Sequence, residues 1–97
     1  MARIWAKILV GDKILKDCMI DTEKYFNIDK FVEYIQAICY ELDIPNPMVL
    51  STHFDKFSEF NHVKFVLDDF VEEIHFERLV LEKAWYSTGE KYGIKTK

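Results

Sequence analysis

The segment that decides the fold reads Asn27-Ile28-Asp29-Lys30-Phe31-Val32-Glu33-Tyr34-Ile35-Gln36-Ala37-Ile38-Cys39-Tyr40-Glu41-Leu42-Asp43-Ile44. Its apolar residues recur at steps of one, three and four, which places them on one face of a helix: Phe31, Val32, Ile35, Ile38, Cys39 and Leu42. Asn27 or Asp29 is suited to cap the first turn. Pro45 is expected to end the helix, because the residue before a proline avoids the helical conformation. We therefore predict an amphipathic helix from Ile28 to Asp43 that lies on an apolar surface.

A predicted β-hairpin precedes this helix and supplies such a surface. Arg3 to Val10 and Lys13 to Ile20 are rich in strand-forming residues, and Gly11-Asp12 between them is a two-residue turn signal. This turn pairs Leu9 with Ile14, Ile8 with Leu15, Lys7 with Lys16, Trp5 with Cys18 and Ile4 with Met19. One face then carries Ile4, Ala6, Ile8, Leu15 and Met19, and the other carries Trp5, Leu9, Ile14 and Cys18. Neither face is purely polar, which predicts either that the sheet is covered on both sides or that one side is an interface.

The chain after the helix predicts a second helix and two further strands. Pro45-Asn46-Pro47 is a turn, and Phe54, Phe57 and Phe60 then recur on one stripe of a short helix capped by Ser51 or Thr52. The remaining predicted elements are a strand from Val63 to Leu67, a helical turn over Asp68–Glu73 capped by Asp68, and a strand from Ile74 to Trp85. We predict one α+β domain over residues 1–86, with an antiparallel sheet of about four strands and the main helix packed on one face, in the order β-β-α-α-β-β. Residues 87–97 read as a flexible C-terminal tail.

Composition and charge exclude several classes of partner. The chain has 97 residues, 13 Lys and Arg against 17 Asp and Glu, and a net charge of −4. An acidic chain is a poor match for nucleic acid or for an anionic membrane surface. It contains no apolar run of about 18 residues and no signal-peptide pattern. Cys18 and Cys39 lie in unrelated contexts and are expected to be reduced and buried, which favours the cytoplasm.

Chemically active side chains gather between His53 and Glu77. The set comprises His53, His62, His75, Asp55, Asp68, Asp69, Glu72, Glu73 and Glu77. Imidazole and carboxylate groups are the ligands that zinc and similar ions take. However, the histidines lack helical i,i+4 spacing and an H-E-x-x-H pattern, and adjacent acids at a helix start commonly serve as caps. We therefore predict no catalytic, cofactor-binding or metal-binding residues.

Two blocks of sequence carry a resemblance. Cys39-Tyr40-Glu41-Leu42-Asp43-Ile44-Pro45-Asn46-Pro47 and Asp68-Asp69-Phe70-Val71-Glu72-Glu73-Ile74 together resemble an uncharacterised family of short bacterial proteins. The resemblance covers roughly residues 3 to 82 and implies a bacterial, soluble, cytoplasmic protein, but it carries no activity and no site residues. It implies an acid at the position of His75, which weakens a metal role for that histidine.

The sequence favours a small non-enzymatic protein-interaction or accessory module. The alternative is a metal-binding protein or small enzyme that uses the His53–Glu77 region. We expect a homodimer formed through an apolar sheet face, because such a face is a liability unless it is buried. Any other partner is expected to be a protein.

Overall fold

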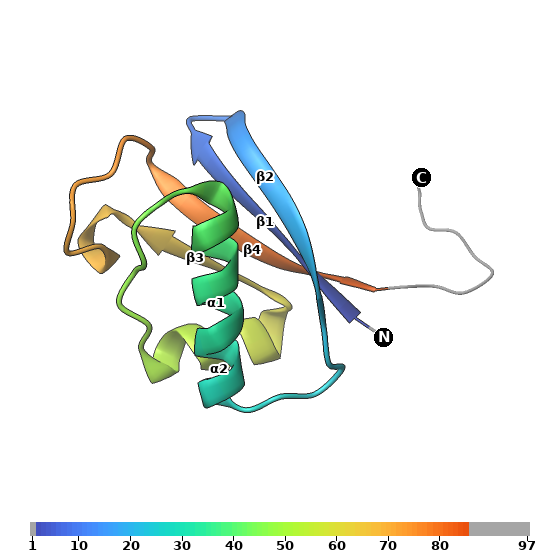
Figure 1. Cartoon of the computed structure of the whole chain (residues 1–97). Coiled ribbons are helices and arrows are strands. Elements are labelled where there is room, and N and C mark those ends of the chain that lie inside the picture. Colours follow the sequence, from blue (N-terminus) through green and yellow to red (C-terminus); the bar gives the residue numbers. More distant parts are fainter. Residues whose placement is uncertain (1, 86–97) are drawn as a thin grey trace.

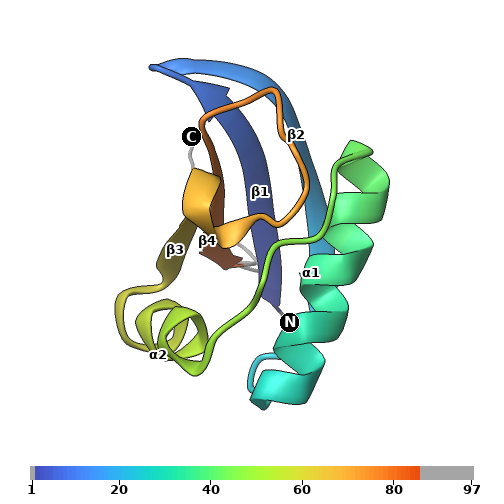
Figure 2. The same cartoon turned by 90° about the vertical axis from the view of Figure 1, so that its left-hand side faces the viewer.

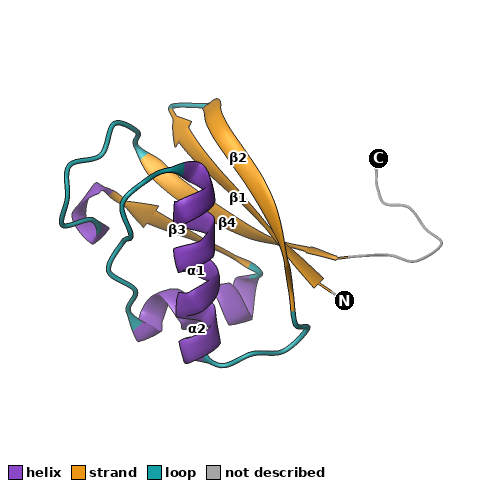
Figure 3. Cartoon of the chain, in the orientation of Figure 1, coloured by secondary structure: helices purple, strands orange, loops and turns teal. Residues whose placement is uncertain are grey.

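The computed structural model describes residues 2–85; residues 1 and 86–97, including the predicted tail at 87–97, lie outside this part of the chain. In chain order the elements are β1 (Ala2–Val10), β2 (Lys13–Thr22), α1 (Ile28–Leu42), α2 (Ser51–Phe60), β3 (His62–Val66), the 3-10 turn η1 (Leu67–Asp69) and β4 (Arg78–Trp85). The predicted α+β class and the order β-β-α-α-β-β are confirmed (Figure 1, Figure 3).

The four strands form one antiparallel sheet in the order β2-β1-β4-β3. The central strands are therefore β1 and β4, and the edges are β2 and β3. Figure 2 shows α1 lying along one face of the sheet, whereas α2 lies beside the edge that β3 forms. In agreement with this view, α1 packs mainly on β2 and α2 mainly on β3.

The core lies between the sheet and the two helices. Its fully buried members alternate along the strands and recur at helical spacing in α1: Ile4, Phe31, Ile35, Ile38, Leu42, Phe57, Phe65, Leu79 and Leu81. The predicted apolar face of the main helix is thus confirmed, except that Val32 is only half-buried. Burial of one large apolar side chain contributes roughly 1.5–3 kcal/mol, so this set is the main stabilising term.

The predicted hairpin register was wrong beyond the turn. Leu9 pairs with Ile14 as expected, but the register shifts by one residue between Ile8 and Leu9. Consequently Trp5 pairs with Met19, and Cys18 lies opposite Ala6 on the inner side of the sheet, against the core. A β-bulge of this kind inserts one residue and moves every later side chain to the other face.

Electrostatics gives a reason for the bulge. Without it, Lys7 would face Lys16, and like charges directly opposite each other are destabilising. With it, Lys7 pairs with Asp17, and the ammonium of Lys16 donates to the carbonyl oxygen of Leu42 at 3.2 Å. A cation at the carboxyl end of a helix is favourable because the free carbonyl groups there carry partial negative charge.

The boundaries of the later elements differ from those predicted. β3 ends at Val66, the helical turn is the three-residue η1, and β4 begins at Arg78 instead of Ile74. The acid that serves this turn is Asp69, whose carboxylate accepts from the backbone N–H of Val66 at 2.8 Å, and not Asp68. Likewise α2 begins without a cap from Ser51 or Thr52.

The main helix ends one residue earlier than predicted and for a different reason than Pro45. Asp43 adopts the left-handed conformation with φ 58°. Its N–H donates to the Tyr40 carbonyl at 3.2 Å, and the N–H of Ile44 donates to the Cys39 carbonyl at 3.0 Å. These two bonds are the Schellman arrangement, which satisfies carbonyl groups that the helix end would leave free. At the other end, Asn27 caps as predicted, because its side-chain oxygen accepts from the N–H of Lys30 at 3.0 Å.

We expect Asp43→Gly to stabilise the protein by roughly 0.5–1 kcal/mol, because glycine adopts a positive φ without the steric cost that a Cβ atom brings. Chemical denaturation of the two proteins measures this difference. Glu41→Gly, two residues earlier on the exposed side of α1, is the matched control and should destabilise by about 1 kcal/mol. Equal losses in both variants would contradict the role given to the left-handed residue.

Candidate functional site

The structure separates the side chains that the sequence places between His53 and Glu77. Glu77 accepts from the N–H of Gly11 at 2.6 Å and so belongs to the β1–β2 turn. His75 is exposed in the segment before β4 and, with Glu73, lines a small groove beside Leu42. Asp55, Asp68 and Glu72 are exposed. Only His53, Asp69 and His62 remain near one another, beside the edge strand β3.

His53 and Asp69 form the buried centre of this region. His53 retains 8% of its exposure and its ring lies 4.4 Å from that of Phe65, measured between centroids. Nδ1 of His53 accepts from the N–H of Leu50 at 3.0 Å, which caps α2 in the way that a glutamate or glutamine at this position often does. Nε2 lies 3.5 Å from Oδ2 of Asp69.

Asp69 connects three segments of the chain. Its carboxylate faces His53 and accepts from Val66, while its backbone oxygen accepts from the N–H of Met48 at 2.7 Å. The segment before α2, the helix itself and η1 are therefore joined through two side chains. Asp69, whose carboxylate could in principle be a metal ligand or a general base, therefore has a structural role that links these segments.

These contacts limit what His53 can do chemically. Because Nδ1 accepts a hydrogen bond, the neutral ring carries its proton on Nε2, which faces a carboxylate. Neither nitrogen has a lone pair directed at solvent. Within residues 2–85, no group of three His, Cys, Asp or Glu side chains is arranged to hold a metal ion.

A groove lies between α2 and β3, directly outside this linked pair. Its volume is about 480 Å³, which is within the range of ligand sites in proteins. We call it the α2–β3 groove. It is lined by Thr52, His53, Lys56 and Phe60 from α2, by His62, Val63, Lys64 and Val66 from β3, and by Asp69 and Val80.

The groove runs beside unpaired backbone groups of β3. The N–H of Lys83 donates to the carbonyl of Asn61 at 2.8 Å, which fixes the phase of the β3–β4 ladder. In an antiparallel pair, the backbone N–H and C=O groups of successive residues point to opposite sides of the strand. Those of Val63 and Phe65 therefore point at β4, and those of His62 and Lys64 point away from it. Among the described residues, no strand lies on that side of β3.

Sequence reasoning missed Lys56, Lys64 and the free edge as site components. Motif searches look for ligand and nucleophile spacing, whereas a strand edge is defined by its absence of a neighbour. A usable signal was present nonetheless. Lys56, His62 and Lys64 fall within nine positions of an acidic chain, on either side of the turn at Asn61.

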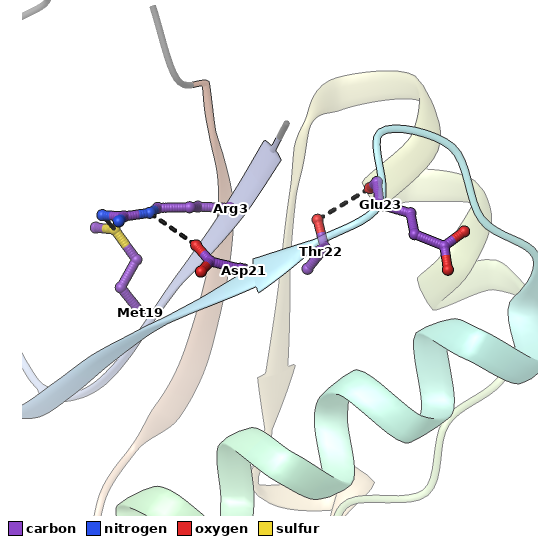
Figure 4. Close-up of polar contacts among 5 residues, drawn as sticks. All are labelled: Arg3, Met19, Asp21, Thr22 and Glu23. Atoms are coloured by element: carbon purple, nitrogen blue, oxygen red, sulfur yellow. Dashed lines mark hydrogen bonds and ion pairs between the residues drawn. The ribbon is translucent and has the colours of Figure 1, made fainter.

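The outer face of the sheet, away from the helices, is a mixed polar and aromatic surface. Lys7 lies over the Trp5 ring, 3.7 Å from its centroid, and its ammonium is 2.7 Å from Glu82. The indole N–H of Trp5 donates to Asp17 at 2.8 Å. Arg3 pairs with Asp21 at 3.0 Å, as Figure 4 shows. The predicted grouping of Trp5 with Cys18 on one face was wrong, because Cys18 lies on the inner side of the sheet.

The two cysteines are unpaired; Cys39 is buried as predicted, whereas Cys18 is only half-buried. Burial, reinforced by the neighbouring Cys18 thiol, raises the pKa of Cys39 from 9.0 to about 12. Burial, and then the carboxylates of Glu41 and Asp17, raise the pKa of Cys18. Thiols held in the protonated form are weak nucleophiles, so neither is suited to covalent catalysis at neutral pH.

The raised pKa of Cys39 predicts a loss of stability at high pH. The unfolded chain releases the thiol proton near pH 9.0 while the folded chain retains it up to about 12, so the free energy of unfolding should fall between these values. Urea unfolding on either side of pH 9.0 measures the slope. Cys39→Ala, compared with the parent at each pH, should show a smaller fall; identical slopes would contradict the assignment.

Comparisons with protein-family models, curated proteins and solved structures give no match to this chain. Among residues 2–85, no helix has the length and apolar character needed to cross a membrane.

Proposed function

We propose that this protein is a small non-enzymatic interaction module that binds an extended peptide as an additional strand along β3. The observation that carries the proposal is the pair of outward-facing backbone groups, at His62 and Lys64, beside the α2–β3 groove. In strand addition, main-chain hydrogen bonds supply affinity and adjoining pockets select alternate side chains. Both ring nitrogens of the buried His53 are engaged within the protein, and burial raises the pKa of the Cys39 thiol, which favours binding over catalysis at these two residues.

The two edge strands of the sheet, β2 and β3, differ in how well each can pair with an added strand. β2 carries a bulge, and its side chains on the outer face include those of Asp17 and Asp21, each of which accepts a hydrogen bond from a side chain of β1. A β-bulge is a device that discourages pairing at an edge. β3 has no bulge in its register with β4, and a helix beside it forms the second wall of a groove. We therefore assign the peptide to β3.

The proposal is tested with a proline in the edge strand. Lys64→Pro removes one outward-facing N–H and leaves the β4 ladder intact, and proline is tolerated at edge strands on the solvent side. We expect Lys64→Pro to lose at least about tenfold in affinity for a fluorescent hexapeptide alternating glutamine with valine, because strand addition depends on these bonds. Lys64→Gln keeps the N–H and is the matched control.

A second peptide tests the proposal on the parent protein, so that misfolding of the Lys64→Pro variant cannot account for the result. In the parent protein, a hexapeptide alternating glutamine with proline lacks every second N–H donor and should not bind. Equal binding of the valine and proline peptides, or no binding of either, would overturn the proposal without any protein variant.

Compartment and assembly are part of the same proposal. Two unpaired thiols are typical of a reducing compartment, so we place the module in the bacterial cytoplasm. A homodimer through an apolar sheet face stays a prediction; the apolar surface that the outer face offers is the paired Trp5, which is partly exposed, and Met19, at 46% exposure. Light scattering should give twice the chain mass of 11.6 kDa, and the single-chain mass would contradict it.

A further inference from the structure

The α2–β3 groove is positively charged on an acidic protein. The chain has a net charge of −4, yet Lys56, Lys64 and His62 line the groove and are all exposed. One carboxylate, that of Asp69, is also part of the lining. It accepts from the N–H of Val66 and faces His53, so its charge is directed into the protein.

Neither lysine has a partner within the described part of the chain. Lys7 engages Glu82 at 2.7 Å and Lys30 lies 3.6 Å from Glu33, but the described residues give Lys56 and Lys64 no such ion pair. On the sheet, the residue opposite Lys64 is Val80, which carries no charge. Glu82, opposite His62, is held by Lys7. The ammonium groups are therefore available to a ligand.

The two lysines lie on different sides of the free edge. Lys64 belongs to the outer face, together with His62 and Val66, whereas Lys56 comes from α2 on the side of the core helices. Side chains of an added strand alternate between the two faces. A strand that extends β3 thus meets a lysine on either face, and carboxylates on it would be neutralised on both.

Apolar surface lies between the charges. Phe60 is 55% exposed and Val66 is 39% exposed, and both line the groove with Val63 and Val80. β-Branched side chains pack well on such a surface of a sheet. The groove therefore matches a ligand that combines acidic residues with β-branched ones.

We infer that the ligand of the α2–β3 groove is an acidic peptide in extended conformation, in which two adjacent glutamate or aspartate residues, one for each face, are flanked by β-branched residues. This inference rests on the proposed function and names the chemistry of the partner. A lysine at the edge also repels basic strands, so the residues that attract an acidic peptide discourage the binding of a basic one.

The test compares two hexapeptides of identical length on the full chain. One has two adjacent glutamates flanked by valines, and the other has two adjacent glutamines in their place. At low salt we expect the acidic peptide to bind about fivefold more tightly, which is the gain that two exposed ion pairs supply. The difference should shrink in high salt, because screening weakens exposed charge pairs.

Charge-reversal variants of the protein distinguish ion pairs made in the groove from the effect of the net charge of the whole chain. Lys56→Glu with Lys64→Glu should remove or invert the preference for glutamate. Lys13→Glu, on the opposite edge strand β2, makes one such charge change away from the groove and should keep the preference. Equal affinities for the two peptides in the parent protein would overturn the acidic ligand and leave strand addition standing. Binding of neither peptide would overturn strand addition itself.

Discussion

Replacing Ile38 by aspartate is expected to abolish the cooperatively folded state. Ile38 is fully buried in the middle of α1, within a core cluster made of apolar side chains. Loss of a buried isoleucine side chain costs roughly 2–5 kcal/mol, and an unpaired buried charge costs more. A domain of this size has a total stability of roughly 5–15 kcal/mol. Circular dichroism during thermal unfolding should show no sigmoidal transition.

Gln36→Asp is the matched control for this change. Gln36 lies two residues earlier on the exposed side of α1, so the same aspartate there tests helix propensity without core burial. We expect it to cost well under 1 kcal/mol, as exposed substitutions usually do. Similar melting curves for the two variants would show that the buried face of the helix has been assigned incorrectly.

Replacing His53 by alanine is expected to cost about 3 kcal/mol. The change removes the acceptor for the N–H of Leu50, the ring that packs on Phe65 and the neighbour of Asp69. A lost cap contributes about 1 kcal/mol, and the cavity left by a buried ring contributes the rest. Denaturant unfolding measures the difference, and a loss below about 0.5 kcal/mol would contradict the linking role.

His53→Gln separates the cap from the packing. A glutamine at the third position of a helix places its side-chain oxygen where it accepts the N–H of the residue before the helix. We expect this variant to recover about 1 kcal/mol relative to alanine. A glutamine variant no more stable than the alanine variant would show that the hydrogen bond from Leu50 contributes little.

The fold was predictable because its largest elements have clean periodicity. The apolar stripe from Phe31 to Leu42, and the turn signal at Gly11-Asp12, each belong to one local pattern. The bulge at Leu15 was not predictable from alternation, since both strands are apolar on both faces and either register satisfies the pattern. Two features favour the bulged register: it separates Lys7 from Lys16, and it allows the bond from Lys16 to the end of α1, which is a contact between residues distant in sequence.

The candidate site was predicted less well than the fold. The sequence brought His53 and Asp69 into one cluster, and they do lie together, but as a structural link and not as ligands. Glu77 and His75 were placed in the same cluster because they are near in sequence, whereas the chain carries Glu77 to the β1–β2 turn and His75 to the groove beside Leu42. The free edge of β3 depends on strand order, which local sequence patterns do not encode.

Amide hydrogen exchange of the parent protein, measured residue by residue with and without the glutamate–valine hexapeptide, tests strand addition most directly. Val63 and Phe65 bond to β4, so their amides should be protected in both states. His62 and Lys64 should exchange freely in the unbound protein and become protected when the peptide saturates the groove. Unchanged exchange at His62 and Lys64 under saturating peptide would contradict a fifth strand on β3.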